Sequence, residues 1–396
     1  MKVYIITKEP FPNGMASTQR IKCYARAIEP YVDKIEILVY IRTEHGIMNN
    51  SKVTGVLGDN IPFKYLPKQT MESDNILLKC FHYIFDRLLL LIFLLKNLEK
   101  GDVVFGYVNS DVRFSLLLIK VIHLLGCVYV RDLCEIPYGT GIESKSNVIK
   151  RKITYKKQFP LLDGVVSISD NLTALFKKYN KHSEVLKVPI MVDFESSNLE
   201  DASSEEKPFI FHCGTLYEQK DGILGMIEAV CMANLKRENK IILKCTGMLK
   251  KSPHANQIQA IINNYNASDT VQFVGYLSDE ELKENLAKAS LVIINKYVNQ
   301  QNTYCFSTKL AEYMAASKPI IITNVGEAMN WLTNNENAVI IPSGNVSVLA
   351  DTINLVIDDL GFRKRIAKNA NLYCQKHFDY KCYGKILVDY FKRIRQ

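Results

Sequence analysis

Short apolar runs alternate with helical stretches along the first half of the chain. The runs are rich in Val, Ile, Leu and Tyr and have the length of a β-strand, whereas the stretches between them carry apolar residues at helical spacing. This alternation predicts an α/β fold with a doubly wound parallel sheet. The expected strands lie near residues 3–8, 34–40, 61–67, 102–108, 128–134, 164–169 and 183–190.

The second half repeats this pattern and so predicts a second sheet of the same kind. After its last strand the apolar positions take up helical spacing to the end of the sequence. The expected strands lie near residues 209–216, 240–247, 271–277, 291–297, 318–324 and 337–344. The expected final helices lie near residues 345–357, 360–376 and 382–394.

A polar segment separates the two halves. Residues 195–207 (ESSNLEDASSEEK) contain one leucine and no other large apolar side chain, which is typical of an exposed linker. We therefore expect two Rossmann-like domains joined by a hinge. Their predicted bounds are residues 1–195, a linker over 196–207, and residues 208–379.

Residues 76–98 predict a helix that is apolar around much of its circumference. Its longest uninterrupted apolar block, residues 88–95, is far shorter than the roughly 20 residues that a bilayer requires. Two interpretations remain open at this stage. The segment is either a core helix, or an exposed helix that faces a membrane surface.

Composition excludes several classes of protein. The 396 residues are 47% hydrophobic and 23% charged, which is typical of a well-packed soluble chain and excludes disorder, collagen-like repeats and a polytopic membrane protein. The ten cysteines form no C-x-x-C pair, so zinc sites and a disulfide framework are not expected. Residues 1–8 are typical of a buried strand and not of a signal peptide, and we expect a cytoplasmic protein.

The net charge of +9 favours an acidic partner. Residues 1–200 hold 27 basic and 21 acidic side chains, and residues 145–157 hold six basic side chains and no acidic one. That run is either a solvated helix face or a contact for anionic lipid or a pyrophosphate-linked acceptor. It lacks the interleaved aromatic residues of a nucleic-acid platform, so no nucleic acid is expected.

Candidate chemistry lies in the turns after the strands, because open parallel sheets bind ligands at the carboxyl ends of their strands. In the first such turn, residues 9–20, Gly14 allows a close backbone approach, and Ser17 or Thr18 can cap a helix whose amino end attracts anions. A plain strand-to-helix turn is the alternative. In a later turn Glu135 follows a strand of the first domain, where it either meets an acceptor hydroxyl or is a structural carboxylate.

The second domain offers two further turns. In residues 212–222, Gly214 leaves space beside the sheet, and Lys220 stands at the entry of the next helix, where it can hold a diphosphate together with the helix amino end. In residues 304–319, Ser307 can cap a helix on which Lys309 and Glu312 share a face. A cation beside a phosphate and a carboxylate beside sugar hydroxyls suit a nucleotide sugar. A solvated lysine and an ordinary amphipathic helix are the alternatives.

Several motifs are absent from the sequence. There is no Asp-x-Asp pair, so the metal-binding signature of many nucleotide-sugar enzymes is missing. There is also no Gly-x-Gly-x-x-Gly after a strand, no Walker lysine loop, no Gly-x-Ser-x-Gly elbow and no histidine pair at metal-binding spacing. We expect neither a metal nor a nicotinamide or flavin cofactor.

Taken together, these segments resemble a retaining GT-B glycosyltransferase of the "glycosyl transferases group 1" family (family 4), of the type that builds bacterial capsule and lipopolysaccharide. The resemblance covers essentially the whole chain. Its most specific parts are residues 306–319 and 212–222, supported by residues 188–193 (VPIMVD) and 274–277 (VGYL).

The resemblance implies a fold of two Rossmann-like domains that face each other across a cleft, with the C-terminal helix, residues 380–396, returning to the first domain. The first domain would bind the acceptor and the second the nucleotide sugar. The implied donor-binding residues are Gly214, Thr215, Lys220, Gly275, Tyr276, Phe306, Ser307, Thr308, Lys309 and Glu312. The implied acceptor-side residues are Gly14, Arg20 and Glu135, and the implied catalytic residues are Lys220, Lys309 and Glu135.

Two positions depart from the family pattern. Tyr304 stands where the first acid of the E-x7-E motif is usual, and Thr215 stands where an arginine usually follows the glycine. Some members share a Ser/Thr-Lys-hydrophobic-x-Glu-Tyr version of the site, which this chain resembles, and Lys309 would replace the missing positive charge.

The implied reaction is metal-independent transfer of a sugar, with retention, from a nucleoside diphosphate sugar to a glycan or lipid-linked acceptor. The implied context is capsule, O-antigen or other surface polysaccharide synthesis, in the cytoplasm, with peripheral contact with the cytoplasmic face of the inner membrane. Two alternatives are a GT-B-type nucleotide-sugar epimerase or hydrolase and a catalytically inactive nucleotide-binding subunit.

Overall fold

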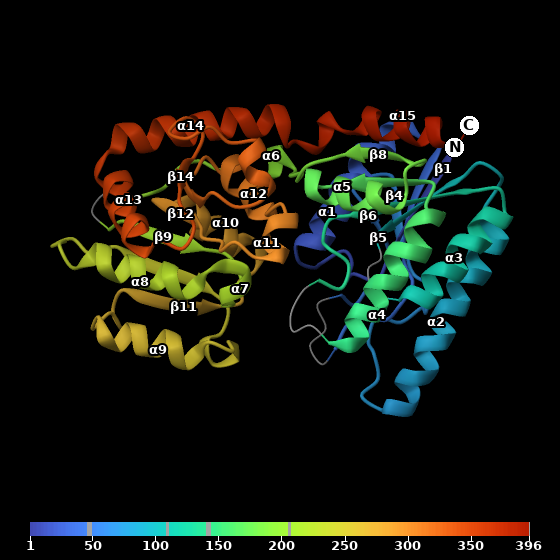
Figure 1. The fold of residues 1–396 in the computed structure, drawn as a ribbon, viewed down its shortest axis with the longest axis horizontal. Helices are drawn as coiled ribbons and strands as arrows, with labels where there is room; N and C mark the ends of the chain where they lie inside the picture. The colour runs from blue at the N-terminus through green and yellow to red at the C-terminus, as the bar shows by residue number, and fades with distance from the viewer. Residues whose placement is uncertain (46–49, 108–110, 140–143, 205–206, 396) are drawn as a thin grey trace. The chain divides into compact units, whose positions relative to one another are not determined.

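The structure is a computed structural model that describes residues 1–45, 50–107, 111–139, 144–204 and 207–395. It divides into two compact units (Figure 1): unit 1 comprises Met1–Met191 with Tyr380–Gln396, and unit 2 comprises Val192–Asp379. The division therefore falls after Met191, slightly before the boundary expected at residue 195. Parts of three predicted segments lie outside the described residues, namely residue 108, residues 205–206 and residue 396.

Unit 1 contains an eight-stranded sheet in the order β3-β4-β2-β1-β5-β6-β7-β8. All neighbouring pairs are parallel except β3 and β4, which are antiparallel. The central strands are buried along their whole length, as expected for a sheet that helices cover on both faces. The strands are β1 (Lys2–Thr7), β2 (Lys34–Val39), β3 (Thr54–Leu57), β4 (Ile61–Tyr65), β5 (Val103–Tyr107), β6 (Val128–Leu133), β7 (Gly164–Ser167) and β8 (Glu184–Lys187).

The helices of unit 1 include one that is distant in sequence. The α15 helix packs against α1, and its Tyr390 hydroxyl accepts a hydrogen bond from Val165 N at 2.8 Å and donates to Glu184 O at 2.8 Å. The expected return of the C-terminal helix to the first domain is confirmed. The α-helices are α1 (Ala16–Ile28), α2 (Ile76–Asn97), α3 (Val112–Leu124), α4 (Lys145–Ile153), α5 (Asp170–Tyr179) and α15 (Gly384–Ile394).

Unit 2 contains a six-stranded, fully parallel sheet in the order β11-β10-β9-β12-β13-β14. The strands are β9 (Phe209–His212), β10 (Ile242–Thr246), β11 (Val271–Gly275), β12 (Leu291–Ile294), β13 (Ile320–Thr323) and β14 (Val339–Ile341). The α-helices are α6 (Phe194–Ser197), α7 (Glu218–Asp221), α8 (Ile223–Asn234), α9 (Ala255–Asn264), α10 (Asp279–Lys288), α11 (Gln300–Tyr304), α12 (Thr308–Ala315), α13 (Val346–Asp358) and α14 (Leu360–His377).

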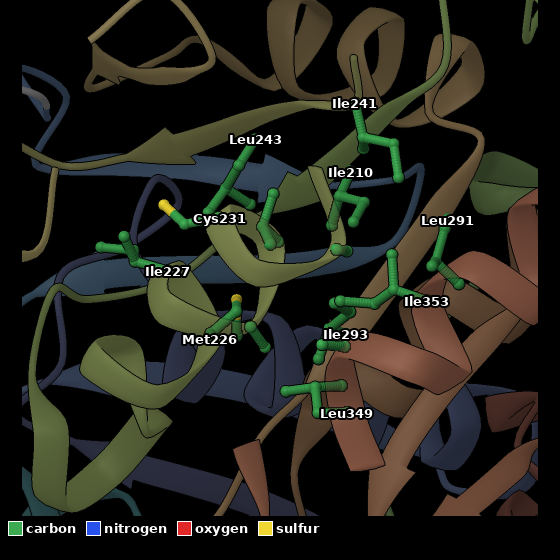
Figure 2. Packing of buried hydrophobic residues seen from close by; sticks show 14 of the residues in the cluster. Ile210, Met226, Ile227, Cys231, Ile241, Leu243, Leu291, Ile293, Leu349 and Ile353 are labelled. Carbon is green, nitrogen blue, oxygen red and sulfur yellow. The ribbon is translucent and has the colours of Figure 1, made fainter. Parts of the chain in front are cut away.

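The core of unit 2 lies between its sheet and the paired helices α8 and α13 (Figure 2). Ile227 of α8 and Ile353 of α13 are fully buried, as are Leu243 of β10 and Ile293 of β12 in the same core cluster. Full burial of one such side chain stabilises the fold by about 1.5–3 kcal/mol. This packing fixes the strand ends, where the candidate site lies.

The segment expected to be an exposed linker is attached to unit 2. The Lys318 ammonium, which is fully buried, donates to Asp201 Oδ1 at 2.7 Å and to Ala289 O at 3.2 Å. Ala202 N also donates to Ala287 O at 3.0 Å. The low apolar content of the segment correctly indicated a surface position, but it did not show that Asp201 neutralises a buried lysine.

Candidate functional site

The carboxyl edge of the unit 2 sheet brings the predicted turns together. Because β9 lies next to β10, the turn after His212 meets the end of β10, where the Thr246 hydroxyl accepts from Gly214 N at 2.9 Å and donates to Gly214 O at 3.0 Å. On the other side of β10, Gly247 N donates to Gly275 O at 2.7 Å. Three strand ends are thereby tied to one another, and sequence analysis missed Thr246 because its partner lies 32 residues away.

An ion pair connects the two most specific segments of the sequence. Lys309 Nζ on α12 lies 2.6 Å from Asp221 Oδ1 at the end of α7. The other oxygen of this carboxylate accepts from Thr215 N at 3.1 Å and from the Thr215 hydroxyl at 2.8 Å. Asp221, which sequence analysis did not single out, therefore organises both turns.

Asp221 is ionised in this environment. It is only 4% exposed, and this burial by itself opposes ionisation, but the Lys309 ammonium holds the pKa of the carboxyl well below its usual range. Lys309 keeps some solvent exposure. Its charge can therefore reach a ligand at this edge while Asp221 fixes its position.

His212 lies buried beside this ion pair. Burial, with a smaller contribution from Lys309, lowers the pKa of its imidazole to about 4, so the ring is neutral at pH 7. Among the residues that the structure describes, neither ring nitrogen has a hydrogen-bond partner. Such an unpaired buried group is unfavourable by itself and is often retained at functional sites.

Gly214 is required by close packing. A Cβ atom at this position would lie 2.8 Å from His212 Nε2, 3.0 Å from Asp221 Oδ2 and even closer to Lys309 Nζ. A larger residue would therefore push the ion pair apart. The space that glycine leaves at this turn is therefore filled by the side chains of His212, Asp221 and Lys309.

Lys220 is exposed on α7, and buried side chains hold the backbone of this turn in place through hydrogen bonds. The buried Lys296 donates to Lys220 O at 3.0 Å, and Asn302 Nδ2 donates to Gln219 O at 3.0 Å. Asn295 Nδ2 adds a hydrogen bond to the nearby Gly222 O at 2.7 Å.

Burial lowers the pKa of Lys296, and the charges of Lys309 and Lys220 act in the same direction. Lys296 follows the apolar strand β12, and this position is the signal that could have revealed it.

The α12 helix begins as predicted, but Ser307 does not cap it in the expected way. Ser307 occupies the N-cap position and its side chain makes no capping hydrogen bond, so the hydroxyls of Ser307 and of the partly exposed Thr308 are not used as helix caps. Glu312 is one turn further on, and its burial raises the pKa of the carboxyl to about 7. A carboxyl with this pKa changes its charge near neutral pH.

Phe306 is a structural residue. It is 3% exposed, and its ring lies 6.1 Å from the ring of Trp331 and 5.8 Å from that of Phe378. The ring is enclosed by other aromatic side chains of unit 2, and the expected contact of this residue with a donor stays a prediction. The packing of the ring supports the start of α12.

Gly275 and Tyr276 form the turn after β11. Gly275 has a φ of +77°, which favours glycine, and the Tyr276 ring is 72% exposed with the Lys251 ammonium 5.8 Å from its centre. An exposed aromatic face beside a cation suits a flat ligand such as a nucleotide base.

In unit 1 the three expected acceptor-side residues have different surroundings. Glu135 is exposed two residues after the end of β6, and Gly14 is exposed before α1. Arg20 is 3% exposed, and its guanidinium donates to Asp132 Oδ2 at 3.2 Å and to Pro189 O at 2.8 Å. Arg20 thus holds a buried structural network together, and the expected acceptor contact stays a prediction.

The caps predicted for α1 are also corrected. Its N-cap is Met15, with no capping side chain. The Ser17 hydroxyl donates to Glu9 Oε2 at 2.7 Å, and the Thr18 hydroxyl donates to Pro10 O at 2.7 Å. Both hydroxyls therefore bind the preceding loop to the first turn of α1. Neither hydroxyl caps the helix, so the amino end of α1 has no side-chain cap.

Within the described part of the chain, no group of three or more His, Cys, Asp or Glu side chains is placed to hold a metal ion. None of the described helices is long and apolar enough to cross a bilayer.

Comparison with known proteins adds a family match. Residues 194–373 match the family model described as glycosyl transferases group 1, and these residues lie within unit 2. The match supports a glycosyltransferase of this group. The unit 2 residues of the candidate site therefore lie in the matched part of the chain.

Two curated relatives have related names. An uncharacterized glycosyltransferase of Methanocaldococcus jannaschii is 22% identical over 188 residues, which are 48% of this chain and 45% of that protein. Alpha-D-kanosaminyltransferase of Streptomyces kanamyceticus is 19% identical over 167 residues, which are 42% of this chain and 40% of that protein. The matched region spans less than half the length of either relative.

Solved structures match over the whole chain. Sucrose-phosphate synthase from Thermosynechococcus elongatus has a TM-score of 0.75 at 14% identity, covering 99% of this chain and 98% of that one. Anabaena HepE in complex with UDP has a TM-score of 0.69 at 14% identity, covering 99% and 100%. The chain has a GT-B-type fold. At these identities the likeness establishes the fold alone, and it confirms the expected two-domain α/β architecture.

Proposed function

We propose that the protein transfers a sugar from a nucleoside diphosphate sugar to an acceptor hydroxyl, and that unit 2 binds the donor. The observation that carries this proposal is the group of three lysines, Lys220, Lys296 and Lys309, at the carboxyl edge of the sheet, where Lys309 is paired with the buried Asp221. Cations at a strand edge beside a helix amino end attract phosphate groups.

The structural neighbours support the class of donor. Anabaena HepE has been crystallised with UDP and with UDP-glucose, and its fold resembles that of this chain. We propose a nucleotide sugar in the corresponding part of unit 2, with Tyr276 beside the base and Glu312 beside hydroxyl groups of the donor. Gly214, Thr215, Ser307 and Thr308 would approach the phosphates through their backbone or hydroxyl groups.

The proposed chemistry is metal-independent and retains the anomeric configuration. When the glycosidic bond breaks, the departing diphosphate gains negative charge. The exposed Lys220 ammonium would stabilise that charge directly, and Lys309 would do so from the position that Asp221 gives it. On the acceptor side, the exposed Glu135 would meet the hydroxyl group, with the backbone at Gly14 nearby in the bound state.

We further propose a glycan or lipid-linked acceptor, as in the synthesis of capsule, O-antigen or another surface polysaccharide. The proposed location is the cytoplasm, with peripheral contact with the inner membrane. This contact is supported by the exposed apolar and basic side chains on helices of unit 1.

The substitution Lys220→Ala tests the proposal. Transfer from a nucleotide sugar should fall by about two to three orders of magnitude, as expected for loss of a charge that stabilises the transition state. The exposed Lys364→Ala in α14 is the matched control and should retain full activity. Unchanged transfer in Lys220→Ala would contradict the assigned role.

The two alternatives give different results with the unmodified protein. If nucleotide binding is detected by calorimetry but no acceptor yields product, the chain is an inactive nucleotide-binding subunit. If a nucleotide sugar is epimerised or hydrolysed without acceptor, the chain belongs to the other enzyme class. A thermal-shift screen of nucleoside diphosphates identifies the base first, because ligand binding raises apparent stability.

A further inference from the structure

Helix α2 buries very little of its own surface. Of its 22 residues only Asp86, Leu90 and Leu94 are buried. A helix that packs against a sheet usually buries a continuous apolar stripe and presents polar side chains to water. On α2 most of the large exposed side chains are instead apolar: Ile76, Leu77, Leu78, Phe81, Tyr83, Ile84, Phe85, Leu88, Ile92 and Leu95.

The neighbouring helices extend this surface. Arg87 of α2 binds Asp111, the N-cap residue of α3, at 2.9 Å, so the two helices are connected (Figure 1). Leu117 and Leu124 of α3 are 48% and 86% exposed. The α4 helix continues into a helical turn that packs against α3. The exposed apolar residues of α4 are Val148 and Ile149.

The same helices expose no carboxylate. Asp86, the one acid within α2, is buried and paired with Arg42. The sequences of α3 and α4 contain no acid at all, and neither does the turn that follows α4. Their exposed charges are all positive: Lys96, Arg113, Lys120, Lys145, Lys150, Lys152, Lys156 and Lys157. We call α2, α3, α4 and that turn the acid-free surface.

We infer that the acid-free surface binds an anionic lipid bilayer, with the exposed side chains of α2 in the boundary between head groups and acyl chains. This inference rests on the membrane contact proposed above and names its surface and its lipid. Apolar side chains beside lysines and arginines are the combination that lies in the plane of a charged membrane. A second copy of the chain is a poorer occupant, because two acid-free surfaces would bring like charges together.

Vesicle sedimentation of the full chain tests the inference. We expect binding to vesicles of phosphatidylglycerol mixed with phosphatidylcholine, and little binding to phosphatidylcholine alone. The variant Leu77→Glu/Phe81→Glu/Ile84→Glu changes three exposed positions on one side of α2 and should weaken binding about tenfold or more. The variant Lys152→Glu/Lys156→Glu should remove the preference for the anionic lipid.

A matched control places the same charges elsewhere. Leu235, Leu355 and Leu372 of unit 2 are also exposed, and the triple glutamate variant at these positions should bind vesicles as the unmodified chain does. Circular dichroism and the melting temperature verify folding of each variant. The inference is wrong if the α2 variant binds vesicles normally or if the unmodified chain ignores anionic vesicles. It is also wrong if the unmodified chain is a dimer that the α2 variant dissociates, since a second copy then covers the surface.

This experiment is separate from the test of glycosyl transfer. Vesicle binding is measured without donor or acceptor, so a chain that fails to transfer sugar can still confirm the lipid surface. Conversely, the α2 variant should show the same thermal shift with nucleotide as the unmodified chain, because its substitutions lie in unit 1 and the proposed donor site lies in unit 2.

Discussion

Lys309 Nζ lies 2.6 Å from Asp221 Oδ1, although 88 residues separate the two in the chain. The pair joins the turn after β9 to the start of α12, and Thr215 completes it from the same turn. In the family pattern an arginine is usual at the position of Thr215. Here a lysine from a distant helix brings positive charge to the same turn, and a buried carboxylate holds it there.

Asp221→Asn should destabilise unit 2. The substitution leaves Lys309 without its countercharge and replaces one carboxylate oxygen, which accepts from Lys309 or from Thr215, by an NH2 donor. The free energy of unfolding should therefore fall by about 1–3 kcal/mol. Because the pKa of Asp221 is lowered in the folded chain, its stabilisation is present above the unfolded value of 3.8 and is lost as the pH falls through the lower folded value. Urea titrations from neutral to acid pH measure both effects.

The exposed Asp351→Asn on α13 is the control for this prediction. It should change the free energy of unfolding by less than about 0.5 kcal/mol. Equal losses in the two variants would mean that the pair between Lys309 and Asp221 contributes nothing specific.

Gly214→Ala should weaken donor binding, although the substitution adds only one methyl group. The added methyl group would meet His212, Asp221 and the Lys309 ammonium, so the side chains must shift, at a cost of about 1–3 kcal/mol. Calorimetry with a nucleoside diphosphate should detect weaker binding. Gly361→Ala, where no atom lies closer than 3.5 Å to the new methyl group, should bind normally.

Glu312→Gln should remove a pH dependence near neutrality. The pKa of Glu312 is raised from an ordinary value of 4.5 to about 7, chiefly by burial. The stability that this group contributes is therefore complete below pH 4.5 and is lost as the pH rises through about 7. Donor binding should follow the charge of the carboxyl, which accepts hydrogen bonds from hydroxyl groups better once it is ionised.

Binding of the nucleotide should accordingly strengthen from pH 6 to pH 8 in the unmodified chain, by about tenfold at most for a single ionisation over this range. In Glu312→Gln the affinity should be the same at both values. A variant that keeps the full pH dependence would show that another group is responsible.

Tyr390→Phe should weaken the attachment of α15. The hydroxyl accepts from Val165 N and donates to the carbonyl of Glu184, and its loss leaves a buried backbone donor without that partner. The free energy of unfolding should fall by about 1–3 kcal/mol. Tyr31→Phe, at an exposed ring, should be neutral, and chemical denaturation distinguishes the two.

Much of the fold could be predicted because the strands are continuous apolar runs. Except for β3, the strands of both sheets lie within a few residues of their predicted positions, as does the helix at residues 76–97. Strand β3 was missed, since most of its residues are not buried and it adds to the edge of the sheet as an antiparallel strand. Edge strands of this kind have too weak an apolar pattern to be recognised.

The candidate site could be predicted only in part. Lys220 and Lys309 follow from local motifs, but their surroundings depend on contacts between distant residues. Arg20 was placed on the acceptor side through the family resemblance alone, whereas Asp132, which neutralises it, comes 112 residues later. Lys296 was overlooked for a similar reason, because its partners are backbone and amide oxygens of other turns.

The return of α15 makes unit 1 discontinuous in the chain, with unit 2 inserted between its two parts. During translation, unit 2 is therefore complete before the residues of α15 leave the ribosome. Until then, the aromatic group of Phe105 and Tyr24 lacks the Phe391 ring, which lies 5.7 Å from Phe105 in the finished fold. Unit 2 can thus fold on the nascent chain before unit 1 receives its last helix.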